Sequence, residues 1–168
     1  AQDSTPLVMF VGQVGTDNAQ GEKYLTDVVA LARADGLAVT ASVVTDVALT
    51  LGVNDRAQLA EAGRLLNART VRRWQLEGAT IQDPATTWID VTATLAPDVT
   101  VLPNTHILRA TAVASGAVIG PDTSLEDCEV GEGATVRRTD ATLAVIGARA
   151  TVGPFAYLRP GTILAEGG

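Results

Sequence analysis

Large aliphatic residues recur at every sixth position over the second half of the chain. The series starts at Ile89 and runs unbroken to Leu125, after which single steps shorten and the rhythm resumes twice. Neither an α-helix, with 3.6 residues per turn, nor a simple strand, with a side-chain period of two, gives a period of six. Its members are Ile89, Leu95, Val101, Ile107, Val113, Ile119, Leu125, Val130, Val136, Ile146, Val152, Leu158 and Leu164.

Small or β-branched residues stand four positions after most of these anchors, and Gly or Pro often follows an anchor within two. Gly and Pro turn the chain at corners. We therefore predict a parallel β-helix with three flat faces, about 18 residues per coil and roughly four coils, because a single coil cannot bury its own core. A β-sandwich, the alternative, has turn signals every ~8–12 residues and no strict period of six.

The first part of the chain alternates between helix and strand patterns. Residues 7–11 form an apolar run typical of a buried strand, and residues 38–44 alternate like a half-buried one. Residues 22–34 predict a helix that ends near Gly36. Its apolar face comprises Leu25, Val28, Val29 and Ala32.

A long helix is predicted to follow, beginning at Asn54 or Asp55, either of which can cap it, and ending near Glu77 and Gly78. At ~1.5 Å per residue it is about 35 Å long, enough for a strut between two bodies. The residues expected to face inward are Leu59, Leu65, Leu66 and Trp74.

Charge and composition exclude several classes of protein. The chain has 12 basic and 19 acidic residues, a net charge of -7, which disfavours binding to nucleic-acid phosphates or anionic membranes. We expect no membrane span, no signal peptide and a cytoplasmic location. The single Cys128 cannot form an internal disulfide, and the single His106 cannot by itself form a His-rich metal site; we expect His106 on the surface.

Four motifs, in the order DNAQGEKYLTD, LGVNDRAQL, DPATTWID and VGPFAYLRPG, occupy residues 17–27, 51–59, 83–90 and 152–161. With the period of six, they resemble the bacterial bifunctional N-acetylglucosamine-1-phosphate uridylyltransferase/glucosamine-1-phosphate N-acetyltransferase family. The resemblance covers about residues 17–168. Eleven arginines against one lysine, with abundant alanine, suggest an actinobacterial version.

The resemblance implies an internal fragment with three parts. These are an α+β remnant of a nucleotidyltransferase domain over residues 17–53, a linker helix over residues 54–79, and an incomplete left-handed parallel β-helix of hexapeptide repeats over residues 80–168. Residues 1–16 depart from the family and read as a strand segment. Residues 1–14 are similar to a segment of thiamine-diphosphate-dependent, acetolactate-synthase-like enzymes, which would make this part foreign.

The family makes UDP-N-acetylglucosamine for peptidoglycan precursors, by acetyl transfer from acetyl-CoA to glucosamine 1-phosphate and then uridylyl transfer from UTP. By this resemblance, Glu22, Tyr24 and Thr26 contact the sugar, Asn54 binds Mg²⁺ and substrate phosphate, and Arg159 binds the phosphate of the amino sugar. An amide oxygen suits Mg²⁺, and a guanidinium suits phosphate. The resemblance also implies a homo-oligomer, a trimer, with weak binding of UDP-N-acetylglucosamine or a sugar phosphate at most.

Other interpretations of these residues stay open. Without the resemblance, Asn54 is a helix cap, Glu22 an acid in a first helical turn, and Arg159 an outward arginine at a β-helix corner. The family's glycine-rich nucleotide loop and its catalytic histidine do not occur in the sequence, so we expect these residues alone to be catalytically inactive. The alternative function is a non-catalytic β-helical scaffold for oligomerisation.

Overall fold

The computed structural model describes residues 10–168, apart from the side chains of residues 47 and 49. The chain divides into two compact units, Ala1–Leu49 and Thr50–Gly168. The second unit contains the long helix and every strand found among the described residues.

The first unit has a small helical core and no strand among its described residues. It contains a 3₁₀-helix, η1 (Leu25–Asp27), followed by the helix α2 (Val28–Ala34); a second 3₁₀-helix, η2 (Val47–Thr50), runs across the division between the units. The buried core residues are Phe10, Val14, Val28 and Ala32, with Leu31 packed against them.

The two strands predicted in this unit are wrong wherever the structure describes them. Residues 10–13 are helical, and residues 38–44 are exposed and form no strand; residues 7–9 lie outside the described part. A strand needs a partner for its backbone hydrogen bonds, and the helical turn at residues 10–13 supplies none. The α+β fold predicted for residues 17–53 is therefore helix and loop only.

The predicted helix over residues 22–34 is confirmed over residues 25–34, as η1 and α2, whereas residues 22–24 are not helical. Half of its predicted apolar face is wrong. Val28 and Ala32 are buried, whereas Leu25 and Val29 are exposed. Leu25 belongs to η1, whose tighter 3₁₀ winding changes the angular position of its side chain relative to α2.

The second unit begins with the predicted long helix, α3 (Arg56–Leu76). Asp55, one of the two predicted caps, is the N-cap, and its carboxylate accepts a hydrogen bond from the Gln58 backbone N–H at 2.8 Å. The Gln58 side chain reaches back to the Asn54 N–H at 2.6 Å, a variant of the capping box. Gly78, at φ 101°, follows the end of the helix.

In the described part of the chain, the buried residues of α3 all lie in its C-terminal half. Its buried positions are Asn67, Thr70, Val71 and Trp74. Trp74 faces inward as predicted, and Leu65 is half-buried, but Leu59 and Leu66 are 60% and 53% exposed. Leu59 lies in the first turns of the helix, which extend beyond the solenoid. Leu66 lies at mid-helix, at the rim of a recess that it lines with Trp88 and Val91, so it is only partly covered.

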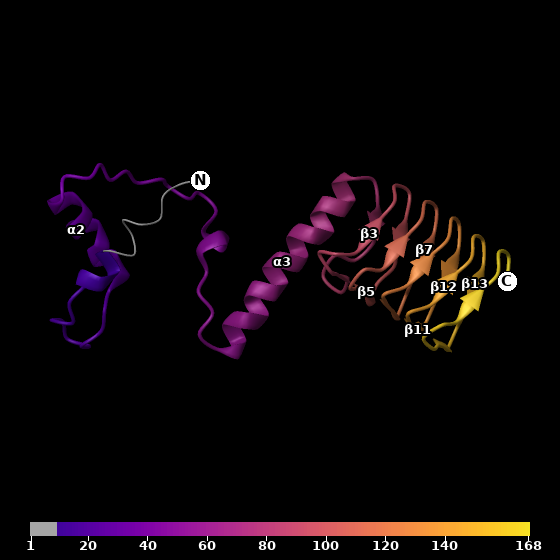
Figure 1. Cartoon of the computed structure of the whole chain (residues 1–168). Helices are drawn as coiled ribbons and strands as arrows, with labels where there is room; N and C mark the ends of the chain where they lie inside the picture. The colour runs from indigo at the N-terminus through magenta and orange to yellow at the C-terminus, as the bar shows by residue number, and fades with distance from the viewer. Residues whose placement is uncertain (1–9) are drawn as a thin grey trace. The chain divides into compact units, whose positions relative to one another are not determined.

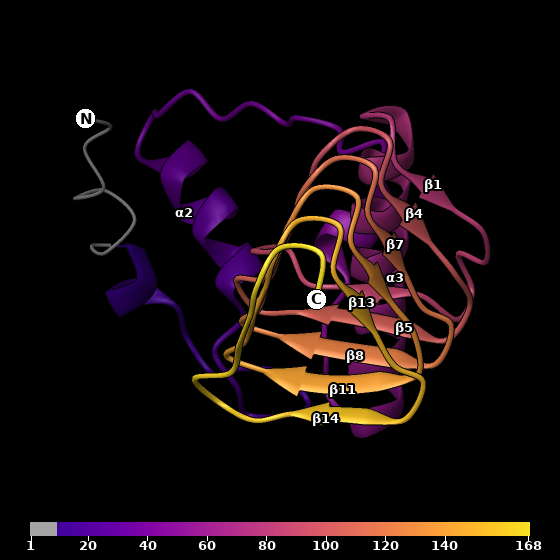
Figure 2. The ribbon, with the colours of Figure 1, turned by 90° about the vertical axis from the view of Figure 1, so that its right-hand side faces the viewer.

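The rest of the unit is the predicted left-handed parallel β-helix, with five coils instead of roughly four. Each coil contributes one short strand to each of three parallel sheets, and Figures 1 and 2 show the coils stacked along one axis. Sheet A contains β1 (Thr80–Ile81), β4 (Thr100–Val101), β7 (Val118–Ile119), β10 (Thr135–Val136) and β13 (Thr151–Val152). Sheet B contains β2 (Trp88–Ile89), β5 (Thr105–Leu108), β8 (Thr123–Glu126), β11 (Thr139–Thr142) and β14 (Ala156–Leu158). Sheet C contains β3 (Thr94–Leu95), β6 (Ala112–Val113), β9 (Glu129–Val130), β12 (Val145–Ile146) and β15 (Ile163–Leu164).

The aliphatic anchors fill the interior of the solenoid, as the period of six predicts. All of them from Ile89 to Val152 are buried, and Leu158 and Leu164 in the fifth coil pack against the same core. The small partners, such as Ala93, Val99 and Thr105, are also buried, since two large side chains cannot share one edge of so narrow an interior.

The break in the series near residue 142 has a structural cause. Ala141 takes the place of a large anchor, because it pairs in register with Leu125 below and Leu158 above. It is fully buried, so the fourth coil is narrower on this side than its neighbours. The steps from Val136 to Ala141 and from Ala141 to Ile146 are five residues each, which fits a shorter circuit.

The first coil is closed from below by α3. The buried Asn67 side chain donates a hydrogen bond to the Thr87 carbonyl at 2.8 Å and accepts one from the Ile89 N–H at 3.0 Å. These are the backbone groups that β2 would otherwise share with a preceding coil. Val71 and Trp74 cover the adjoining end of the core, so α3 acts as the N-terminal cap of the solenoid.

We expect Asn67→Ala to lower the free energy of unfolding of the second unit by about 2–4 kcal/mol. The substitution leaves one buried donor and one buried acceptor unpaired, at about 1–3 kcal/mol each. Denaturant unfolding measures the change. Asn67→Asp is the matched variant, because it keeps an acceptor for Ile89 but replaces the donor to Thr87 by a buried carboxylate oxygen facing that carbonyl, and a loss at least as large is expected. Equal unfolding midpoints for Asn67→Ala and the unsubstituted chain would contradict the capping role.

Candidate functional site

Arg159 lies at the corner between sheets B and C in the fifth coil. It follows Leu158, the residue that pairs in register with Ala141 of the coil below. Its carbonyl accepts hydrogen bonds from the N–H of Thr162 at 3.0 Å and from its hydroxyl at 2.7 Å, which fixes the turn. The guanidinium is exposed and makes no hydrogen bond or ion pair with residues 10–168. It is therefore free to bind an anion.

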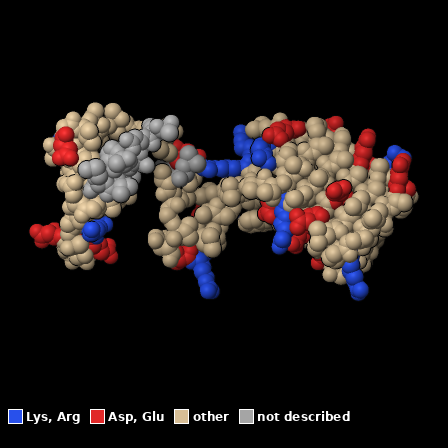
Figure 3. Space-filling model, in the orientation of Figure 1, with Lys and Arg blue, Asp and Glu red and all other residues tan. Residues whose placement is uncertain are grey.

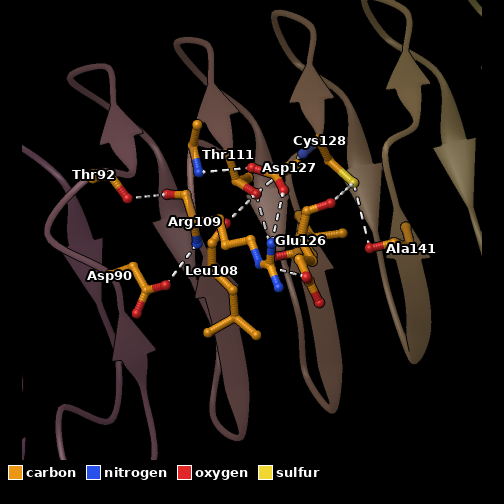
Figure 4. A network of polar contacts seen from close by, with 11 residues as sticks. Asp90, Thr92, Leu108, Arg109, Thr111, Glu126, Asp127, Cys128 and Ala141 are labelled. Atoms are coloured by element: carbon orange, nitrogen blue, oxygen red, sulfur yellow. Dashed lines mark hydrogen bonds and ion pairs between the residues drawn. The ribbon is translucent and has the colours of Figure 1, made fainter. Parts of the chain in front are cut away.

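A polar network runs up the same corner through the lower coils (Figure 4). The Arg109 N–H donates to Asp90 Oδ2 at 2.7 Å, and its Nε lies 2.5 Å from Glu126 Oε1. Its Nη1 lies 3.9 Å from Asp127 Oδ2. Two carboxylates pair with the guanidinium and a third accepts from the backbone N–H of the same residue, so these coils are locally negative and this lower part of the corner disfavours a phosphate. Arg159 stands above it, beyond the row of acids.

Cys128 lines the inside of this corner. Its backbone N–H donates to the Thr111 hydroxyl at 3.1 Å, and its Sγ lies 3.3 Å from the Glu126 carbonyl and 3.4 Å from the Ala141 carbonyl. The side chain is fully buried. Burial raises the pKa of the thiol above its ordinary value, because a thiolate loses solvation there. Cys128 is thus a packing residue.

Glu22, Tyr24 and Thr26 follow one another through a turn held by the Asn18 side chain. Asn18 Oδ1 accepts from the N–H groups of Gln20 and Glu22 at 3.2 Å each, and its Nδ2 donates to the Glu22 carbonyl at 2.5 Å. The Tyr24 hydroxyl bonds the Gln20 side chain. Glu22 and Thr26 are exposed and Tyr24 is half-buried, so the Glu22 and Thr26 side chains are available to a ligand, while the Tyr24 hydroxyl donates to Gln20.

Asn54 stands just before α3, with its side chain exposed. It is not the N-cap, since Asp55 holds that position, so its amide remains free for another partner. Arg159, at the far end of the same unit, is separated from it by the helix and the whole stack of coils. The second unit therefore carries two separate candidate sites, while Glu22, Tyr24 and Thr26 form a third candidate within the first unit.

The described residues do not make up a metal centre. No group of three or more His, Cys, Asp or Glu side chains among residues 10–168 could hold a metal ion. Mg²⁺ takes six ligands, several of them water or phosphate oxygens, and Asn54 offers one amide oxygen. On these residues alone the magnesium site does not form.

The surface carries no broad basic face in the view of Figure 3, where acidic and basic side chains lie interspersed over the solenoid. No helix in the described part of the chain is long and apolar enough to cross a membrane. His106 is exposed on sheet B, as expected, directly before the anchor Ile107.

Sequence reasoning missed the Arg109 network and the role of Asn67. The network was detectable in principle, because Asp90, Arg109 and Asp127 recur 19 and 18 residues apart, which is close to one coil. Asn67 had no such signal, because nothing in the sequence of a helix indicates that one of its amide side chains will hydrogen-bond to the edge of a strand.

Comparison with known proteins shows that the chain is similar to one part of several proteins named Bifunctional protein GlmU. It is 63% identical over 166 residues to the one from Clavibacter sepedonicus, covering 99% of this chain and 34% of that protein. It is 54% identical to that of Micrococcus luteus and 57% identical to that of Pseudarthrobacter chlorophenolicus, over 168 residues and 100% of this chain in each case. No family model matches the chain.

The chain therefore spans about a third of the length of the relatives it matches. These relatives are actinobacterial, as the composition suggested. Two of the alignments include residues 1–16, which favours one continuous sequence over a junction with a thiamine-diphosphate enzyme.

We expect the stability of the chain to fall with pH in the range where the Cys128 thiol ionises. Because the folded pKa is raised, the unfolded chain loses the thiol proton first, so the free energy of unfolding decreases as pH rises above about 8.5. Denaturant unfolding of the chain and of Cys128→Ala, compared from pH 7 to 10, isolates this contribution. A pH dependence identical in the two proteins, or alkylation of the folded thiol as fast as of the unfolded one, would count against it.

Proposed function

Because this chain belongs to the family of the bifunctional protein GlmU, we propose that it is the part of such an enzyme that joins a uridylyltransferase domain to an acetyltransferase β-helix. The enzyme then makes UDP-N-acetylglucosamine for peptidoglycan precursors. The observation that carries the proposal is 63% identity along 99% of the chain to one such protein. The fold supports it, since a helix leads into a hexapeptide-repeat β-helix in the order that the resemblance implies.

Within this proposal, residues 17–53 are the end of the nucleotidyltransferase domain, residues 54–79 the linker, and residues 80–168 the first part of the acetyltransferase domain. Arg159 binds the phosphate of glucosamine 1-phosphate. Its exposed and unpaired guanidinium supports this role, because its N–H groups match two phosphate oxygens. The acidic residues around Arg109, in the coils below, would repel a phosphate, so phosphate binding is favoured at the upper end of the corner, where Arg159 lies.

Glu22, Tyr24 and Thr26 bind the sugar of the uridylyl-transfer reaction. Their turn is fixed by Asn18, so they present a carboxylate and two hydroxyls in a set order, and such groups suit sugar hydroxyls. Asn54 contributes one amide oxygen to Mg²⁺, whose other ligands come from substrate and from parts of the enzyme outside these residues. Bound there, Mg²⁺ neutralises phosphate charge during uridylyl transfer.

We also propose a homotrimer in the cytoplasm, where UTP and acetyl-CoA are found. Sheet C supports association, because its outer face is shallow and lined mostly by small residues around a groove of about 690 Å³. Ala96, Ala112, Ala114, Gly131 and Gly147 are among the residues of this groove. Small side chains let a second copy approach closely, and burying this apolar face would stabilise the assembly.

A hybrid enzyme tests the proposed roles. These 168 residues replace the aligned third of the Clavibacter sepedonicus protein, and both transfer reactions are assayed on one preparation. We expect Arg159→Ala to lower kcat/KM for glucosamine 1-phosphate in acetyl transfer by about ten- to a hundredfold, since a hydrogen bond to a charged group contributes about 1.5–3 kcal/mol. Asn54→Ala should lower uridylyl transfer by a similar factor.

Arg149→Ala serves as the control in the hybrid, because Arg149 pairs with Glu166 at another corner and has no proposed role. Both activities should survive this change. A hybrid with neither activity, or an Arg159→Ala variant with unchanged acetyl transfer, would overturn the assignment. The alternative, a non-catalytic scaffold, predicts an oligomeric hybrid in which no substitution at these positions changes turnover.

A polypeptide of these 168 residues alone should catalyse neither reaction, because the family's nucleotide loop and catalytic histidine are not in this sequence. Pyrophosphate release with UTP and thiol release with acetyl-CoA measure the two activities. Turnover in either assay that disappears on substitution of Asn54 or Arg159 would show that these residues suffice.

A further inference from the structure

The corner between sheets A and B stacks four residues from successive coils. Asn104, Asp122, Arg138 and Phe155 all adopt a left-handed backbone conformation, with φ between 51° and 65° except for Arg138 at 44°. The backbone N–H groups of the last three each donate to a carbonyl of the coil below. Their side chains therefore leave the corner one above another, about 4.8 Å apart.

Arg138 is held in place by its neighbours in this stack. Its Nε lies 3.5 Å from Asp122 Oδ2, and its guanidinium carbon lies 6.0 Å from the centroid of the Phe155 ring. The other oxygen of Asp122 accepts from Asn104 Nδ2 at 3.0 Å. Asp122 is thus occupied on both oxygens, while the Nη atoms of Arg138 make no hydrogen bond with residues 10–168.

A recess of about 250 Å³ opens beside Arg138 on the side of sheet A. Arg137 lies in it and follows Val136, which pairs in register with Ile119 below and Val152 above. Its guanidinium is exposed and makes no contact with a carboxylate in the described part of the chain. The residues that line the recess are Pro121, Arg137, Arg138, Thr151, Gly153 and Pro154.

The lining of this recess is suited to a small anion. Its lining residues include two arginines and one threonine but no acidic residue, although the chain as a whole carries a net charge of -7. Two consecutive arginines, one oriented by Asp122 and one without an acidic partner, offer several N–H donors to a tetrahedral oxyanion. We propose that this recess binds the phosphate group of a small phosphate monoester.

A second recess on the side of sheet B indicates what the phosphate is attached to. It has about 390 Å³, shares Arg138 with the first, and presents neutral and acidic hydrogen-bonding groups, among them Asn104, Ser124 and Asp140. Such groups suit the hydroxyls of a sugar. The ligand class is therefore a phosphorylated sugar, either free or as part of a nucleotide whose base could lie against Phe155, which is 84% exposed.

This site is separate from the proposed acetyltransferase site. Arg159 stands at the corner between sheets B and C, whereas Arg137 and Arg138 stand at the corner between sheets A and B, across the full width of sheet B. The proposal does not rest on the proposed function.

Titration of the full 168-residue chain tests the site, followed by the backbone amide signals of residues 137, 138 and 151 in NMR spectra. The probes are ribose 5-phosphate, UMP, inorganic phosphate and uncharged ribose. We expect saturable binding of ribose 5-phosphate and none of ribose. Arg137→Gln should weaken binding by roughly tenfold, the equivalent of one lost charged hydrogen bond.

Arg149→Gln is the control for loss of one positive charge, since Arg149 is also an exposed arginine but lies at another corner, where it pairs with Glu166. It should bind the probes as the unsubstituted chain does. Arg137→Lys, which keeps the charge, should bind more tightly than Arg137→Gln, and unchanged amide signals of the core would show that both variants are folded.

Phe155→Leu separates the two sources of the phosphate. If it weakens UMP but not ribose 5-phosphate, the site takes a nucleotide; if it affects neither, the site takes a sugar phosphate, and both results support phosphate binding at Arg137. No saturable shift up to about 10 mM of ribose 5-phosphate or UMP would overturn the proposal. Equal weakening by Arg137→Gln and Arg149→Gln would do the same, because it would show a nonspecific charge effect.

Discussion

Each coil of the solenoid depends on the coil next to it for the hydrogen bonds of its backbone. The strands are two to four residues long, so none has enough contacts to persist alone. One aliphatic anchor per face fills the interior, and it is large except at Ala141. Register follows from this, because an anchor must lie directly above an anchor. The flat faces and the stacked corners are consequences of that single constraint.

A stack of this kind has backbone groups at each end that no neighbouring coil pairs with. At the N-terminal end, a side chain forms hydrogen bonds with these groups. The Asn67 amide carries one donor and one acceptor at nearly the spacing of a peptide group, so it replaces a strand at β2. Gln75 Nε2, 3.5 Å from the Ile81 carbonyl, makes a weaker contact of the same kind at β1. The helix is thereby tied to the solenoid as well as covering it.

The solenoid was predictable from sequence because its constraint repeats. Ile107 and Val113 each obey the same rule as eleven other anchors, so local errors do not accumulate. The helix boundaries also followed, from Asp55 and Gly78. The strand predicted at residues 38–44 was wrong, because alternation of apolar and polar residues indicates a strand only where a partner strand exists. The prediction that Leu59 and Leu66 face inward was wrong for a related reason, since an apolar helix face is buried only where another element covers it. The candidate site residues were identified from the resemblance of their motifs to a known family. The structure adds that the Arg159 guanidinium is unpaired within the described residues and that Asp55, not Asn54, caps α3.

The stacking of equivalent positions also bears on how such a protein can change its length in evolution. Insertion or loss of one residue inside a strand would turn outward side chains inward. The five-residue steps from Leu125 to Val130 and on either side of Ala141 show that a coil can lose a residue between its strands. Gain or loss of an entire coil would keep the inward and outward orientation of every side chain and would shift the following coils by one inter-strand spacing of ~4.8 Å. The solenoid can therefore lengthen or shorten most easily by whole coils. Side chains at one corner can be separated only by multiples of that spacing.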